Sequence, residues 1–98
     1  MTIYQFRSSK TVSGGTTSTI SLNVPGGICR QVRIVAATAS TTFITVITDD
    51  KGLEVMRYSS QTGELNDITA FPMSGDYTVS ITNASADEVF TIYFAVEE

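Results

Sequence analysis

The chain has 98 residues, of which 42% are apolar and 16% are charged, and its net charge at pH 7 is −4. This length allows one domain with one core, and the composition is too apolar for a disordered chain. No apolar run approaches the roughly 20 residues of a membrane helix, and nucleic-acid binding relies on positive charge that neutralises phosphates. We therefore expect a single soluble domain, residues 1–98, with no membrane or nucleic-acid partner.

The chain contains one cysteine, Cys29, and no histidine. A single cysteine cannot form an internal disulfide, and without histidine a zinc site would need a shell made almost entirely of carboxylates. Cys29 is therefore expected to be a small buried apolar residue. Residues 1–7 lack the basic start and apolar block of a secretion signal, so we expect no such signal.

Glycine and proline divide the chain into short segments in which apolar and polar residues alternate, the pattern of an all-β sandwich or barrel. No segment longer than one turn repeats its apolar residues with a period of 3.6, so essentially no helix is expected. The fold class predicted is a single antiparallel β-sandwich of about eight strands. In chain order these are residues 2–7, 18–24, 28–38, 42–48, 53–58, 65–71, 77–82 and 89–96.

The third expected strand, residues 28–38, carries two cations in an otherwise apolar sequence. Strict alternation places Arg30 and Val32 on one face, and Cys29 and Arg33 on the other. The two arginines are then expected on opposite faces. They indicate either a strand end that reaches solvent or a salt-bridged interface.

The last expected strand, residues 89–96, is apolar on both faces. Phe90 and Phe94 lie on one face, while Tyr93 and Ala95 lie on the other. Strands that are apolar on both sides are covered on both sides. We therefore expect a neighbouring surface to cover the second face.

The sequence offers no group of residues typical of an active site. Nucleophilic hydrolysis needs a base beside the nucleophile, and the commonest one, histidine, is absent. Asp49 and Asp50 point in opposite directions in an extended chain, which does not suit glycoside hydrolysis. With Lys51 and Gly52 they are typical of a hairpin turn and lack the spacing of a calcium loop. We expect no enzyme activity, cofactor or metal.

Residues 74–83, Ser-Gly-Asp-Tyr-Thr-Val-Ser-Ile-Thr-Asn, are followed by Phe-Thr-Ile-Tyr at 90–93. Together they resemble the last hairpin of small jelly-roll-like sandwich domains, such as bacterial pre-peptidase C-terminal domains and carbohydrate-binding modules. The resemblance covers about the last quarter of the chain and implies a jelly-roll-like sandwich. It also suggests a glycan-binding module as one possible function, with Tyr58 and Tyr77 as the aromatic residues to test.

As a small sandwich rich in serine and threonine, the chain also resembles in type the accessory proteins of tailed-phage virions, such as head decoration and other minor structural proteins. That resemblance implies a virion protein, made in the host cytoplasm, that binds copies of itself or a major capsid or tail protein. All six basic residues lie at or before Arg57, and seven of the ten acids follow it. Such a split suits head-to-tail packing of a homo-oligomer. The residues expected to contact partners are Tyr4, Phe6, Arg7, Arg30, Arg33 and Tyr93.

Overall fold

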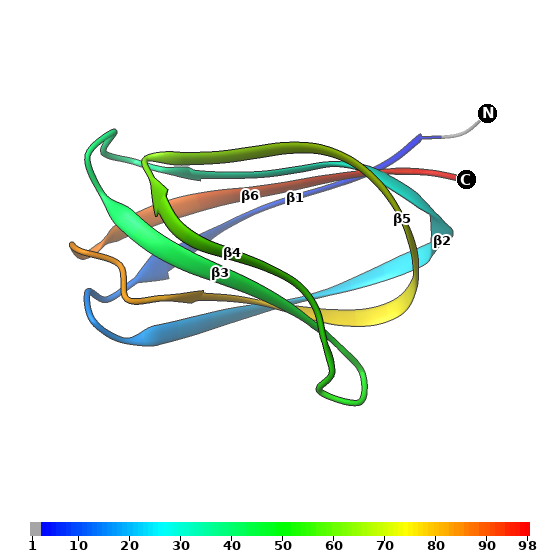
Figure 1. Ribbon diagram of the computed structural model, residues 1–98, viewed down its shortest axis with the longest axis horizontal. Helices are drawn as coiled ribbons and strands as arrows, with labels where there is room; N and C mark the ends of the chain where they lie inside the picture. The colour runs from blue at the N-terminus through cyan, green and yellow to red at the C-terminus, as the bar shows by residue number, and fades with distance from the viewer. Residues whose placement is uncertain (1–2) are drawn as a thin grey trace.

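The computed structural model describes residues 3–98, and this part of the chain forms strands and turns without a helix (Figure 1). The strands make one antiparallel sheet in the order β1-β6-β2-β5-β3-β4. The predicted all-β antiparallel fold is therefore confirmed. The first expected strand began at Thr2, which lies outside the described residues. The strands are β1 (Ile3–Val12), β2 (Thr17–Ala36), β3 (Thr42–Asp49), β4 (Glu54–Thr62), β5 (Glu64–Thr82) and β6 (Glu88–Glu97).

Two strands are much longer than the others: β2 has 20 residues and β5 has 19. They pair along most of their length, and the register shifts between Val24 and Gly27. Beside this shift Gly26 has a φ of 108°, and Gly75 on β5 has a φ of 94°, values that glycine adopts readily. Both strands curve back at this point (Figure 1). Each of them therefore contains two of the eight expected segments, which is why eight segments form six strands.

The bend in β2 and β5 divides the sheet into two halves. The first half orders its segments as β1, β6, residues 28–36 of β2 and residues 64–73 of β5. The second half orders them as residues 17–24 of β2, residues 75–82 of β5, β3 and β4. Two such four-stranded layers connected in this order have the strand arrangement of a jelly roll.

The core lies between the two halves. Phe90 on β6 and Phe43 on β3 meet edge to face, with ring centroids 5.0 Å apart. Alternation places every second residue of each strand on this inner side, where burial of a large apolar side chain contributes roughly 1.5–3 kcal/mol. Other fully buried members of this core are Val32, Ile34, Ile47, Met73, Val79, Ile81, Ile92, Phe94 and Val96.

The second face of β6 is only partly covered within the subunit. Tyr93 is half-buried, Val89 is 45% exposed and Ala95 is buried. Phe90, by contrast, is completely buried in the single chain. The apolar residues of β6 are thus largely covered by the chain's own fold, and Tyr93 and Val89 remain available for an external contact.

A bulge in β2 places the two arginines on the same side of the sheet, unlike the alternation expected from the sequence. The register of β2 against both β5 and β6 shifts between Cys29 and Gln31, so one extra residue is inserted there. Cys29 therefore points into the core and is fully buried. The prediction that Cys29 is a small buried apolar residue is confirmed. Arg30 and Arg33 are both exposed on the outer side of the first half, and their expected placement on opposite faces is wrong.

Candidate functional site

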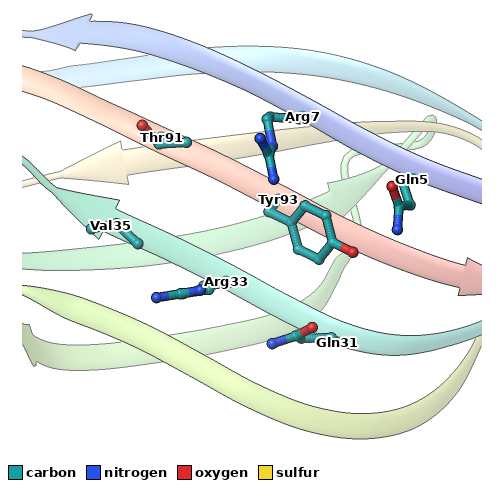
Figure 2. Close-up of a pocket in the computed structure, with 7 residues that line it drawn as sticks. All are labelled: Gln5, Arg7, Gln31, Arg33, Val35, Thr91 and Tyr93. Carbon is teal, nitrogen blue, oxygen red and sulfur yellow. The ribbon is translucent and has the colours of Figure 1, made fainter.

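The outer side of the first half contains a shallow depression of about 500 Å³ (Figure 2). It forms where three neighbouring strands bring their outward residues together. In the ladder, Tyr93 of β6 lies opposite Arg7 of β1 on one side and opposite Arg33 of β2 on the other. The complete lining is Gln5, Arg7, Gln31, Arg33, Val35, Thr91 and Tyr93.

Tyr93 is the central aromatic residue of this depression. The guanidinium carbon of Arg7 lies 5.7 Å from the centroid of its ring, a cation–π contact that contributes about 0.5–1 kcal/mol at an exposed site. Figure 2 shows the ring between Arg7 on β1 and Arg33 on β2. The arrangement presents one aromatic surface and two guanidinium groups to an incoming partner.

The charges around the depression are only partly balanced. Arg33 Nη2 lies 3.0 Å from Glu64 Oε1, and the two side chains are 48% and 41% exposed, so solvent weakens this ion pair. Arg7 forms no ion pair with any residue in the range 3–98. The depression therefore has a local excess of positive charge on a chain whose net charge is negative.

Two ion pairs connect early basic residues with late acidic residues in the folded subunit. Arg33 pairs with Glu64, and Arg30 Nη2 lies 3.1 Å from Glu97 Oε1. Each pair joins an early arginine to a late glutamate of the same chain. Two of the six basic residues are thus paired with late acids of the same subunit.

The structure brings together three of the six residues expected to contact partners, namely Arg7, Arg33 and Tyr93. Arg30 lies on the same outer side but does not line the depression. Tyr4 and Phe6 lie on the inner side of β1. Their register partners are the buried residues Val96 and Phe94, and both pack against the core.

Four lining residues were not among the expected contacts: Gln5, Gln31, Val35 and Thr91. Gln5 lies two residues before Arg7, and Gln31 lies two residues before Arg33. Residues two apart in a strand share a face, so each glutamine lies on the same face as its arginine. The sequence contains this signal. It does not show that β6 lies between β1 and β2, the strand order that places one glutamine on each side of Ala95.

The strongest pKa perturbations lie elsewhere, in a cluster at the inner side of β2, β4 and β5. The Tyr58 hydroxyl donates a 2.7 Å hydrogen bond to Asp67 Oδ2. Burial, followed by this bond and the negative charge of Asp67, raises the pKa of Tyr58. Burial also raises the pKa of the Cys29 thiol to about 11. Both groups are therefore protonated at neutral pH, and the Tyr58–Asp67 hydrogen bond connects the two halves of the sheet.

The paired aspartates form the hairpin turn that their sequence predicts. Asp49 Oδ1 accepts hydrogen bonds of 2.9 Å from the backbone N–H groups of Lys51 and Leu53. Within residues 3–98, no three or more side chains of the ligating types gather into a group that could hold a metal ion. The same residues include no helix with the length and apolar character needed to cross a membrane.

The depression thus combines an exposed aromatic ring, two arginines and two amides in an open surface. No protein-family model matches the chain, and the search of curated proteins finds no match. The function of the chain is therefore inferred from its own surface.

Proposed function

We propose that the chain is a non-enzymatic structural protein of a phage virion that attaches to the lattice of a capsid or tail protein. The observation that carries this proposal is the open depression in which Arg7 and Arg33 flank Tyr93. Tyrosine and arginine are enriched at the centres of protein interfaces, and they supply a large share of the binding free energy there. A shallow surface of this kind suits a protein partner better than a small substrate, which is usually bound in an enclosed cleft.

The electrostatics of the depression favour an acidic surface on the partner. Arg7 has no carboxylate partner among the described residues, so an acidic group can approach without displacing an existing ion pair. Complementary charge mainly speeds association and selects the partner, while the buried aromatic contact slows dissociation. Arg7 is therefore assigned to recognition and Tyr93 to affinity.

The jelly-roll strand order is consistent with this proposal. Jelly rolls occur in viral capsid domains, but also in lectins and in cupins. Fold alone does not determine function. The surface residues of the depression therefore carry the argument, and the fold supports it only by analogy.

The proposal is tested with virions purified from the source that encodes the chain. Labelled protein is mixed with these virions and sedimented through a density gradient. We expect the wild type to band with the particles. Arg7→Glu and Tyr93→Ala should each reduce the bound fraction at least tenfold, because one reverses a charge and the other removes the aromatic surface.

Arg57→Glu is the matched control. Arg57 is an exposed arginine in β4, in the other half of the sheet, and it pairs with Glu54 at 2.7 Å. Its reversal changes the net charge by the same amount as Arg7→Glu but leaves the depression intact. Wild-type protein that stays at the top of the gradient, or equal losses for Arg7→Glu and Arg57→Glu, would contradict the proposal.

A glycan-binding module is the second candidate, and one observation favours it. The Tyr93 ring shares the depression with the amide of Gln5 and with the amide of Gln31, whose Nε2 donates a 2.8 Å hydrogen bond to Asn66 Oδ1. The ring can stack on a sugar, and the Gln5 amide and the Gln31 amide oxygen can hydrogen-bond it. Tyr58 and Tyr77 suit this role less well. The Tyr58 hydroxyl is bonded to Asp67, and the Tyr77 hydroxyl accepts a 2.9 Å bond from the backbone N–H of Ser74. Titration with soluble polysaccharides separates the candidates: a sugar signal lost in Tyr93→Ala and kept in Tyr58→Phe would favour the glycan module.

A further inference from the structure

The folded sheet leaves four strand segments with a neighbour on one side only, within the part of the chain that the structure describes. β1 pairs only with β6, and β4 pairs only with β3. Residues 17–24 of β2 pair only with β5, and residues 64–73 of β5 pair only with β2. A free edge exposes unpaired backbone N–H and C=O groups, to which another strand can bind.

Three of these edges carry features that oppose the addition of a strand. Lys10 lies in β1 opposite Phe90, on the face that otherwise meets the core. Asp67 lies in the same way on β5, opposite the buried Val32. Inward charges of this kind are a known protection of edge strands. β4 is instead distorted by two register shifts, and Ser60 within it has a φ of 57°.

The fourth edge, residues 17–24 of β2, has none of these features. Its sequence, Thr-Ser-Thr-Ile-Ser-Leu-Asn-Val, contains no charged residue, proline or glycine. Its register with β5 runs without a break from Thr17 to Val24. It is therefore a regular, uncharged strand edge, and this distinguishes it from the other three.

The backbone groups that face outward on this edge can be assigned. The Asn23 carbonyl accepts a 3.3 Å hydrogen bond from the Tyr4 hydroxyl, so it does not point to β5. The N–H and C=O of one residue point to the same side of an antiparallel strand, and the side alternates along the strand. Ser21 and Thr19 therefore also direct their backbone groups to the free side.

We propose that residues 17–24 pair antiparallel with the same segment of a second copy, centred on Ile20. Thr19 of each copy then lies opposite Ser21 of the other, and the outward N–H and C=O groups of these two residues bond across the junction. A partner segment without charge avoids the repulsion that two copies of β1, each with Arg7 and Lys10, would meet. The proposal goes beyond lattice binding and is independent of the depression, which lies in the other half of the sheet.

The side chains on both faces of this junction suit self-pairing. On the outer face, hydroxyls of threonine and serine meet across strands, and such pairs stabilise sheets. The same contact already exists within the subunit, where the hydroxyl oxygens of Thr17 and Thr82 are 2.6 Å apart. On the inner face, Ile20 meets Ile20 of the second copy. Ile20 is only partly buried in the single chain, so pairing removes further apolar surface from water.

Sedimentation velocity over a wide concentration range tests the proposal. We expect the wild type to change from monomer to dimer as concentration rises. Thr19→Lys/Ser21→Lys should weaken the dimer at least tenfold, because each lysine then lies opposite a lysine of the second copy. Thr78→Lys/Ser80→Lys is the matched control. Those residues are the β5 neighbours of Ser21 and Thr19 in the ladder, so the same charges are added one strand away from the edge.

Amide hydrogen exchange of the wild type provides a second measurement that needs no variant. The N–H groups of Thr19 and Ser21 should exchange quickly in dilute solution and become protected at concentrations where the dimer forms. A wild type that remains monomeric throughout, or a dimer in which these two amides stay unprotected, would overturn the proposal. Loss of virion binding by Arg7→Glu does not bear on either measurement, so the two proposals fail separately.

Discussion

The hydroxyl of Tyr58 donates a 2.7 Å hydrogen bond to Asp67 and thereby joins the free edge of β4 in one half of the sheet to the free edge of β5 in the other. A hydrogen bond of this kind contributes about 1 kcal/mol when it is partly exposed. We expect Tyr58→Phe to lower the free energy of unfolding by about this amount, measured by urea denaturation. An unchanged midpoint would contradict a stabilising role for this hydrogen bond.

The same contact gives the protein a sensitivity to alkaline pH. The pKa of Tyr58 is raised in the folded state above its ordinary value of about 10. Below that pH both states keep the proton, and the full stabilisation is present. Above it the unfolded state loses its proton first, so the free energy of unfolding falls as pH rises. The difference between wild type and Tyr58→Phe should therefore shrink between pH 10 and pH 12, and a constant difference would contradict this assignment.

Cys29 is predicted to be unreactive in the folded protein. The residue is fully buried, and burial raises the pKa of its thiol to about 11, while thiol reagents attack the thiolate. With 5,5′-dithiobis(2-nitrobenzoate) at pH 8, we expect the native protein to react at least a hundredfold more slowly than the same chain in guanidinium chloride. Equal rates would show that the strand bearing Cys29 opens readily.

Thr45→Val is predicted to stabilise the fold. The Thr45 side chain is fully buried on β3, and its hydroxyl has no hydrogen-bond partner. A buried hydroxyl without a partner destabilises a protein by about 1–3 kcal/mol, and valine has nearly the same shape. The variant should unfold at a higher temperature in calorimetry. Thr48→Val, at a partly exposed position on the same strand, is the control and should change little.

Gly27→Ala is predicted to be strongly destabilising. A Cβ atom at this position would collide with the backbone carbonyl of Glu97 at the end of β6, and neither backbone can move without breaking the ladder. Gly52→Ala is the comparison, because Gly52 has a φ of 78° but open space around it. Gly52→Ala should cost only the strain of its backbone conformation, about 1–2 kcal/mol. A smaller loss for Gly27→Ala than for Gly52→Ala in denaturant unfolding would contradict this prediction.

Alternation and turn residues were sufficient to predict the strands, because both are local signals. Tyr77, Val79 and Ile81 show this well: the alternation predicts their strand, and the structure places them in residues 75–82 of β5. The bulge at Arg30 could not be predicted, since strict alternation fits the sequence equally well on either side of it. One inserted residue turned Cys29 into the core and brought both arginines to the same side.

Three of the seven residues that line the candidate site were expected from the sequence, but the geometry of the site was not. Arg7, Arg33 and Tyr93 were expected to make contacts, and they lie on adjacent strands. Tyr4 and Phe6 also belong to an alternating segment, but the sequence alone did not show which face of β1 would meet the core. That choice depends on the pairing of β1 with β6, across more than 80 residues of chain.

The continuous passage of β2 and β5 through both halves also determines how the protein comes apart. Neither half has a complete set of strands of its own, because the paired strands β2 and β5 run through both halves. If one half unfolded, the segments of β2 and β5 in the other half would lose the inner face against which they pack. The molecule should consequently lose its structure in a single cooperative step, with equal calorimetric and van't Hoff enthalpies.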